Sequence, residues 1–215
     1  MKWKNILLLP VLSVLFSQNA SAFCESSSTA VSITINPGNV KYITTMSRDD
    51  FIRQPGQSIS PYTLGLTVAK LNITGDATPN VEVQNNKMCV SLSSVHINMG
   101  YDDLRVYIDK KYKPKSCEYK VIKNHENYHV AVAQQATVFF KKDIEKQVQD
   151  TLRKMKPQIV STTYERDRVV REQFNKVIDD LRPLIEHINK VITKKNYQID
   201  TPESYAATKK LCKHW

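Results

Sequence analysis

Hydrophobic and polar residues alternate along the first half of this chain, whereas in the second half apolar residues recur every three or four positions. Strict alternation is typical of β-strands with one buried face, because successive side chains of a strand point to opposite sides. Turn-forming pairs such as Pro37-Gly38, Gly75-Asp76 and Asn85-Asn86 lie between the alternating segments. The first half therefore predicts an antiparallel or mixed β-sheet, with strands over residues 31–35, 40–44, 62–68, 81–83, 90–92, 95–99 and 104–108.

The helical half opens with one long apolar stripe, which runs from Tyr119 to Leu152. Neither Pro nor Gly occurs between Ser116 and Met155, so no residue in this stretch forces an interruption. A single straight helix of that length is unusual in a small domain, and we expect it to end or bend after Lys142.

A second helix is predicted to follow and to fold back along the first. Thr162 and Glu165 form a capping-box pattern at its start, and Pro183 lies inside its apolar stripe, where it predicts a kink. A connection at residues 156–158 makes the two helices an αα-hairpin. A short last helix begins near Pro202, because Pro suits the first turn of a helix. The chain is thus predicted to have an α+β fold.

The N-terminus has the composition of a secretory leader. Basic residues precede an apolar run at residues 6–16, and Ala20-Ser21-Ala22 provides the small residues of a cleavage site before Phe23. No later segment is apolar for long enough to span a bilayer, so we expect a periplasmic or secreted protein with no transmembrane segment after cleavage. The predicted organisation is a signal peptide over residues 1–22 and a single domain over residues 23–215, with a β half (23–115) and an α half (116–215).

Four cysteines fit export to an oxidising compartment, where an even number usually pairs. Three connectivities are open. Cys89 lies at the start of a predicted strand and Cys117 just before the long helix, so we expect Cys89–Cys117 to join the sheet to that helix. The second disulfide, Cys24–Cys212, would then join the two ends of the mature chain. No Cys-x-x-Cys is present, which argues against a redox site or a cysteine-zinc knuckle.

The net charge narrows the classes of partner. The formal charge of +10 falls to +8 when the leader is removed, because the leader carries Lys2 and Lys4 and no acidic residue. Lysines are frequent in residues 110–123, where they either solvate a loop and a helix start or form a basic rim that attracts an acidic substrate or an anionic envelope polymer. Arginine and aromatic residues are not interleaved along the chain, so the sequence gives no indication of nucleic-acid binding.

The strongest chemical signal is the pentad His125-Glu126-Asn127-Tyr128-His129. Residues four apart share one face of a helix, so His125 and His129 can bind one metal ion together. Zn²⁺ prefers imidazole nitrogens, and a catalytic site keeps one position open for a water molecule, for which Glu126 would be the general base. The pentad therefore predicts one zinc ion per chain. The alternative is a pair of solvent-facing histidines on an ordinary amphipathic helix.

A third ligand must come from elsewhere in the chain. Val132 and Gln135 stand where the metzincin extension of the motif needs Gly and His. Glu145 is about 24 Å from His129 along the same helix, at about 1.5 Å per residue, and cannot reach the metal. Other acids and histidines of the α half are candidates: Glu165, Glu172, Glu186, His187 and Glu203.

From the predicted strands through the pentad to the C-terminal segment, the chain resembles an uncharacterised bacterial family of secreted zinc-dependent proteases. The resemblance covers roughly residues 85–212, and its specific motif is the pentad. That family has a C-terminal segment of the type Tyr-Asp-x-x-Thr-x-His-Gly, whose histidine is proposed to complete the metal site. Residues 197–204 align with it, which puts Glu203 at the histidine position and implies a His₂Glu site. Tyr197 and Tyr205, close to that position, are candidate donors to an oxyanion.

The function expected from these features is hydrolysis of amide bonds in a protein or peptide substrate, which can belong to the cell envelope, by a zincin-like domain. In most zincins an edge strand holds the peptide by main-chain pairing, and residues 104–108 are the first candidate, ahead of residues 90–99. Two other classes stay open. One is a non-catalytic zinc-binding or envelope-binding module of the same fold, and the other is an envelope structural protein whose pentad is accidental.

Overall fold

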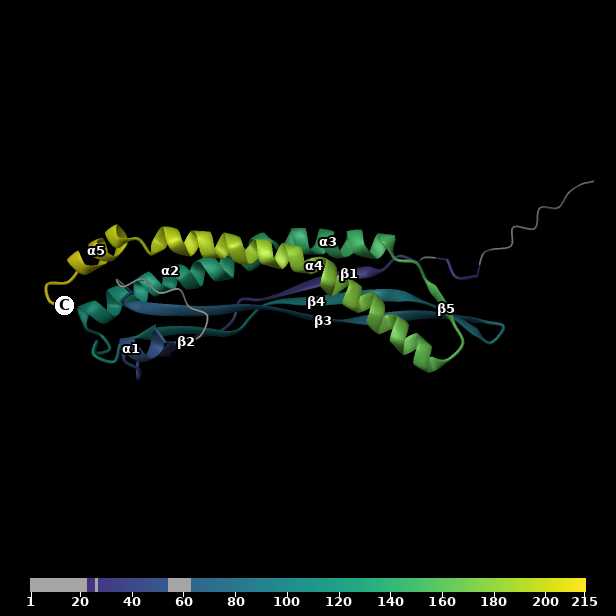
Figure 1. The fold of residues 1–215 in the computed structure, drawn as a ribbon, viewed down its shortest axis with the longest axis horizontal. Helices are drawn as coiled ribbons and strands as arrows, with labels where there is room; N and C mark the ends of the chain where they lie inside the picture. Colours follow the sequence, from purple (N-terminus) through teal and green to yellow (C-terminus); the bar gives the residue numbers. More distant parts are fainter. Residues whose placement is uncertain (1–22, 26, 54–62) are drawn as a thin grey trace, which may run out of the picture.

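The computed structural model describes residues 23–25, 27–53 and 63–215, so the predicted leader lies outside the described residues. In this part of the chain one sheet is combined with several helices, which confirms the α+β class (Figure 1). None of the described helices is long and apolar enough to cross a membrane. The elements are β1 (Ala30–Asn36), β2 (Val40–Ile43), α1 (Arg48–Phe51), β3 (Gly65–Gln84), β4 (Lys87–Ile108), α2 (Cys117–Phe139), α3 (Lys141–Lys154), β5 (Gln158–Val160), α4 (Thr163–Ile199) and α5 (Pro202–Lys210).

Strand β4 is the centre of the sheet. It pairs antiparallel with β3 along one edge. Along the other edge it pairs parallel with β1 and β2 and antiparallel with β5, so the sheet is mixed. Residues 104–108 and 90–99, the predicted substrate-binding strands, both belong to β4. That prediction is wrong, because neighbouring strands already pair with the main chain of β4 on both sides.

Strands β3 and β4 are much longer than the predicted strands, at 20 and 22 residues. The turn predicted at Asn85-Asn86 is confirmed, and both residues have positive φ (49° and 61°), as a two-residue hairpin turn requires. The turn predicted at Gly75-Asp76 is wrong, since both residues lie inside β3. Gly75 is needed there because a Cβ atom would lie 2.2 Å from the carbonyl oxygen of His96 on β4.

The two largest of three clusters of buried apolar side chains hold most of the helices against the sheet. The larger cluster consists of Ile33, Leu92, Val95, Ile97, Met99, Ala136, Phe140, Ile144, Val148, Val177, Leu181 and Ile188. The smaller cluster consists of Tyr101, Leu104, Val106, Ile108, Ile122, Val130 and Ala133. Burial of each large apolar side chain is worth about 1.5–3 kcal/mol. The smaller cluster therefore holds α2 against β4 both before the pentad, at Ile122, and after it, at Val130 and Ala133. The Tyr101 hydroxyl also donates a 3.0 Å hydrogen bond to the Ala133 carbonyl.

The long apolar stripe is divided between two helices, as expected, but the break comes earlier than Lys142. Helix α2 ends at Phe139 and α3 begins at Lys141. Phe140, between them, has φ −85° and ψ 1°, is 6% exposed, and packs its ring edge-on against His187 of α4 at 5.7 Å between centroids. The break therefore coincides with the insertion of an aromatic ring into the core, and no Pro or Gly is involved.

Helix α4 folds back along α3 and α2, as the predicted αα-hairpin requires (Figure 1). The capping box is confirmed: Thr162 accepts a hydrogen bond from the Glu165 amide, and the Glu165 carboxylate accepts one from the Thr162 amide. Pro202 opens α5, also as predicted. The connection after α3 contains the strand β5, which the sequence did not predict and which pairs with residues 88–90 of β4.

Both disulfides form, but the predicted pairing is wrong. Cys24 pairs with Cys89, and Cys117 pairs with Cys212. The reason is the length of β4, which rises about 3.3 Å per residue and so carries the chain roughly 60 Å from Cys89 to Ile108, close to the start of α2. Cys117 is therefore at the far end of the molecule from Cys89, whereas the αα-hairpin returns Cys212 to its side.

We predict that the two disulfides stabilise different parts of the protein. The Cys117→Ser/Cys212→Ser variant removes a link across 95 residues and should lower the free energy of unfolding by about 2–5 kcal/mol in urea denaturation. It should also speed amide hydrogen exchange in α5, because that helix loses its tether to α2. The matched Cys24→Ser/Cys89→Ser variant should lose stability without faster exchange in α5. Equal exchange rates of α5 in the two variants would contradict this division.

Candidate metal centre

The pentad lies in α2, whose N-terminus is capped by Ser116 through a 3.2 Å hydrogen bond from the Tyr119 amide. The three functional side chains are on the covered side of the helix: His125 and His129 are each 6% exposed, and Glu126 is 2% exposed. The helical placement is therefore confirmed, and the alternative of two solvent-facing histidines is wrong.

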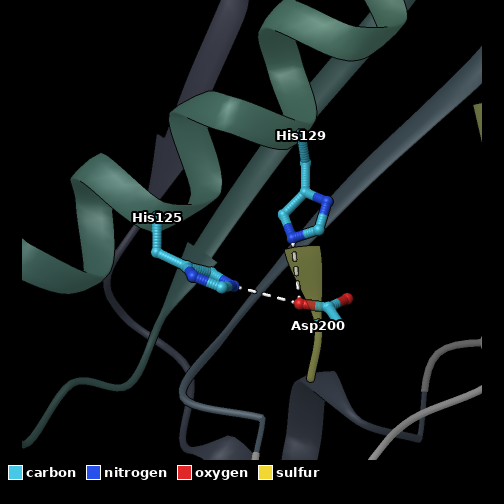
Figure 2. A group of neighbouring side chains, drawn as sticks. All are labelled: His125, His129 and Asp200. Carbon is cyan, nitrogen blue, oxygen red and sulfur yellow. Dashed lines mark hydrogen bonds and ion pairs between the residues drawn. The ribbon is translucent and has the colours of Figure 1, made fainter. Parts of the chain in front are cut away.

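The residue that joins the two histidines is Asp200, the C-cap of α4. Its Oδ1 atom lies 3.0 Å from His125 Nε2 and 3.1 Å from His129 Nε2. Figure 2 shows both rings directed at this one oxygen, with Asp200 approaching from the opposite side to α2. Within the described residues these three side chains form the group that can hold a metal ion, with their ligand atoms all within 4.8 Å of one another.

The two histidine–aspartate distances are close to the ligand spacing of a tetrahedral metal site. Two zinc–ligand bonds of about 2.0–2.1 Å at the tetrahedral angle separate the ligand atoms by about 3.3 Å. The two histidine–aspartate distances are a few tenths of an ångström shorter than this, so a small opening of the group is enough to admit the ion. Two neutral imidazoles and one carboxylate are also a donor set that zinc accepts.

Asn196, one turn before Asp200 on α4, fixes the orientation of the second histidine. Its side-chain oxygen lies 3.1 Å from His129 Nδ1. That oxygen only accepts, so Nδ1 carries the proton and donates it. His129 Nε2 then directs its lone pair at the Asp200 carboxylate, an arrangement that is stable only with a second proton on the ring or a cation between the two atoms. A hydrogen bond of this kind is the usual support of a metal-binding histidine.

The electrostatics of the group favour a cation. Burial raises the pKa of Asp200, but hydrogen bonds from His125, His129 and Tyr205 outweigh burial and hold the pKa well below its usual range. Burial lowers the pKa of His129, yet the carboxylates of Asp200 and Glu126 outweigh it and raise that pKa. The Asp200 carboxylate is thus ionised at neutral pH, and negative charge is concentrated between the two rings.

Glu126, next to this group, is held by strand β3. Its Oε2 atom accepts a 2.8 Å hydrogen bond from the Thr67 hydroxyl. Gly65 provides the space beside it, because a Cβ atom there would lie only 2.7 Å from Glu126 Oε1. Burial raises the pKa of Glu126 and outweighs the opposing effects of His129, His125 and Thr67. The carboxylate is therefore held in a fixed position next to the metal group without belonging to it.

The acid suggested by the family resemblance, Glu203, is not part of the group. It is exposed in the first turn of α5, three residues beyond Asp200, where an acid favours the positive end of the helix. The other candidates have separate surroundings. Glu165 belongs to the capping box of α4, Glu172 pairs with Arg168, Glu186 is exposed, and His187 packs against Phe140.

Of the two candidate tyrosines, only Tyr205 lies at the site. It is 3% exposed, its hydroxyl donates a 2.6 Å hydrogen bond to Asp200 Oδ1, and its ring centroid is 5.0 Å from that of His125. Tyr197 is 60% exposed on α4. Burial, followed by the Asp200 carboxylate, raises the pKa of Tyr205, so its hydroxyl stays protonated and remains a donor.

Four residues of the site were missed by the sequence analysis: Gly65, Thr67, Asn196 and Asp200. For the last two a signal was present, because Asn196 and Asp200 are four residues apart, the same spacing that brings His125 and His129 to one face. The residues on β3 had no comparable signal, since their proximity to Glu126 depends on how the sheet packs against α2.

Comparison with known proteins adds no relative from which residues could be assigned: no protein-family model, no curated protein and no solved structure matches the chain. The site therefore stands on its own geometry.

We predict that the protein binds about one Zn²⁺ per chain through His125, His129 and Asp200. Elemental analysis after gel filtration should show that His125→Ala, His129→Ala and the isosteric Asp200→Asn each lose the metal. Asn196→Ala should retain the ligands but weaken zinc binding by about 10–100-fold, because it removes the support of one histidine.

Glu203→Gln is the matched control for Asp200→Asn, since each change removes one carboxylate from the same segment. It should bind zinc as the unmodified protein does. Loss of zinc in Glu203→Gln together with normal zinc in Asp200→Asn would show that the wrong acid has been assigned.

Proposed function

We propose that the protein is an exported zinc-dependent peptidase. The observation that carries this proposal is Glu126, a buried carboxylate with a raised pKa that lies beside the His₂Asp group and is not part of it. A protein that only binds zinc needs the three ligands, but it has no use for an acid held in place by Thr67 and accommodated by Gly65. A hydrolase needs such a group as its general base.

The chemistry assigned to each side chain follows from its contacts. Zinc held by His125, His129 and Asp200 would polarise the scissile carbonyl and acidify a water molecule. Glu126 takes the proton of that water while the new carbon–oxygen bond forms, and returns it to the leaving amine as the carbon–nitrogen bond breaks. Because Thr67 engages Oε2, the free oxygen for this transfer is Oε1. A raised pKa suits both steps, since the same carboxyl must accept and then donate.

Tyr205 is the candidate donor to the developing oxyanion. Its hydroxyl is at hydrogen-bond distance from the proposed ligand atom of Asp200, so a substrate carbonyl bound at the same ion would come within its reach. In the absence of substrate the same hydroxyl orients the Asp200 carboxylate toward the two histidines.

A peptide substrate fits best along the outer edge of β3. Within the described residues β3 pairs only with β4, so its other edge offers free main-chain groups. Gly65 and Thr67, at the beginning of β3, lie against Glu126. An extended peptide that adds to this edge by main-chain hydrogen bonds would run past the base. This role replaces the one expected for β4.

The proposed compartment is the periplasm or the extracellular space. Two disulfides, with no free cysteine in the described residues, fit an oxidising environment, and the leader-like N-terminus fits export. The substrate would be a protein or peptide of that compartment.

We predict that Glu126→Gln abolishes peptide hydrolysis while the zinc content stays near that of the unmodified protein. Glutamine has nearly the same shape but cannot take up the proton, so the loss isolates the base from the metal. Activity on a degenerate peptide library, read by mass spectrometry with and without a chelator, provides the measurement. Undiminished, chelator-sensitive cleavage by Glu126→Gln would refute the mechanism. Stoichiometric zinc without any cleavage by the unmodified protein would instead support the non-catalytic zinc-binding module.

We also predict that Gly65→Ala disables the base without touching the metal ligands. The added methyl group would lie 2.7–2.9 Å from three atoms of the Glu126 side chain and must displace it. A displacement near 1 Å lowers turnover by roughly 100-fold. Lys70→Ala, an exposed change on the same strand, is the control and should leave turnover unchanged. Equal kcat values for Gly65→Ala and Lys70→Ala, at equal zinc content, would show that Glu126 needs no fixed position.

A further inference from the structure

One end of the molecule carries a concentration of exposed lysines that the metal site does not use. They come from two segments far apart in the sequence, the loop between β4 and α2 and the C-terminal segment that includes most of α5. These segments, residues 110–116 and 204–215, contain no Asp or Glu. We call the surface they form the basic face, and its lysines are Lys110, Lys111, Lys113, Lys115, Lys209, Lys210 and Lys213.

The two segments are fastened to each other, so the basic face is a defined surface. The Cys117–Cys212 disulfide links them directly. The rings of Tyr112 and Trp215 pack edge-on at 6.0 Å between centroids, and the Trp215 indole N–H donates to the Lys209 carbonyl. Figure 1 shows the C-terminus beside the start of α2.

Large apolar side chains are exposed among these lysines. Leu211 is 68% exposed and Trp215 is 43% exposed. Lys111 places its ammonium group 4.7 Å from the centre of the Tyr112 ring, next to Trp215. Exposed Trp and Leu side chains surrounded by lysines are the composition of surfaces that lie in the headgroup region of a bilayer. A soluble anionic polymer would engage the lysines alone and would gain nothing from Leu211.

Nearby acids do not neutralise the basic face. Asp109 is buried, and its carboxylate accepts hydrogen bonds from the Arg48 and Lys111 amides. Asp50 is held in the capping box of α1 by Ser47, although Lys110 also lowers its pKa. Glu118 lies half-buried in the first turn of α2. The surface therefore keeps a strong positive potential.

We propose that the basic face binds the surface of a membrane that contains anionic phospholipids. The lysines contact lipid phosphates, and Leu211 and Trp215 enter the headgroup region. The interaction does not require the zinc site or hydrolysis. It does bring the site near the lipid, because α2 begins in the basic face at Cys117 and carries His125 about two turns later.

The test uses residues 23–215, in which Trp215 is the single tryptophan, so its fluorescence reports directly on the basic face. Phosphatidylcholine vesicles containing one-quarter phosphatidylglycerol should sediment the protein and shift the tryptophan emission to the blue. Pure phosphatidylcholine vesicles should do neither. Each lysine near an anionic surface is worth about five-fold in partitioning, so the Lys111→Gln/Lys113→Gln/Lys213→Gln variant should bind roughly 100-fold more weakly.

A variant with the same change of charge elsewhere provides the control: Lys141→Gln/Lys142→Gln/Lys154→Gln, on α3, should bind as the unmodified protein does. Leu211→Gln should reduce both binding and the blue shift, whereas Glu126→Gln should alter neither, which separates this proposal from the peptidase. Equal weakening by the two triple variants would mean that only net charge matters and would overturn the proposal. So would binding to soluble polyphosphate as tight as that to vesicles, or sedimentation with vesicles without a blue shift.

Discussion

The convergence of two histidines on the Asp200 Oδ1 atom depends on the lengths of the helices. Helices α2 and α3, with 23 and 14 residues, run away from the metal group, and α4, with 37 residues, returns toward it. At about 1.5 Å per residue the outgoing arm is roughly 38 Å long from His129 to Lys154, whereas α4 is roughly 55 Å long. Helix α4 begins beyond the end of α3, after β5, and its end therefore reaches the level of the pentad, where Asp200 meets the two histidines (Figure 1). Loss of one turn from α4 would withdraw Asp200 by about 5.4 Å, beyond the reach of any metal bond.

The sheet makes this return possible, because it is as long as the hairpin that lies on it. β3 and β4 extend over 20 and 22 residues, and the larger apolar cluster fastens all three long helices to them. At the end that carries the metal group, the smaller cluster fixes α2 to β4, and the Cys117–Cys212 disulfide fixes the C-terminal segment to α2. Helix α2 and the C-terminal segment, which provide the metal group, are thus held in place by contacts other than the metal. Such support is what a preorganised site requires, since its side chains must keep their geometry in the absence of the ion.

The local features of this fold could be predicted from the sequence, because they depend on neighbouring residues. The spacing of His125 and His129, the capping box of Thr162 and Glu165, and the start of α5 at Pro202 are all of this kind. Features that depend on distant pairs could not. The disulfide partners, the merging of short strands into β3 and β4, and the approach of Gly65 to Glu126 depend on the register of the sheet and on how it packs against α2. The third ligand is an intermediate case. The return of the C-terminal segment to the pentad was foreseeable from the hairpin, but the choice between Asp200 and Glu203 depends on which residue ends α4.

A metal ion at this position would also stabilise the fold. The ionised Asp200 carboxylate and the two buried imidazoles are brought together from α2 and from the end of α4, and a cation satisfies all three at once. An ion that binds only the folded arrangement stabilises it, and more so the tighter it binds. The zinc proposed here would therefore also hold the end of α4 against α2. The proposed membrane-binding face lies close by, where the start of α2 meets the C-terminal segment at Cys117, Cys212 and Trp215. The disulfide already ties that face to α2, so the direction in which the β3 edge faces relative to the lipid surface would not depend on the ion. The presentation of substrate and catalysis would then both depend on the contact between α2 and the C-terminal segment.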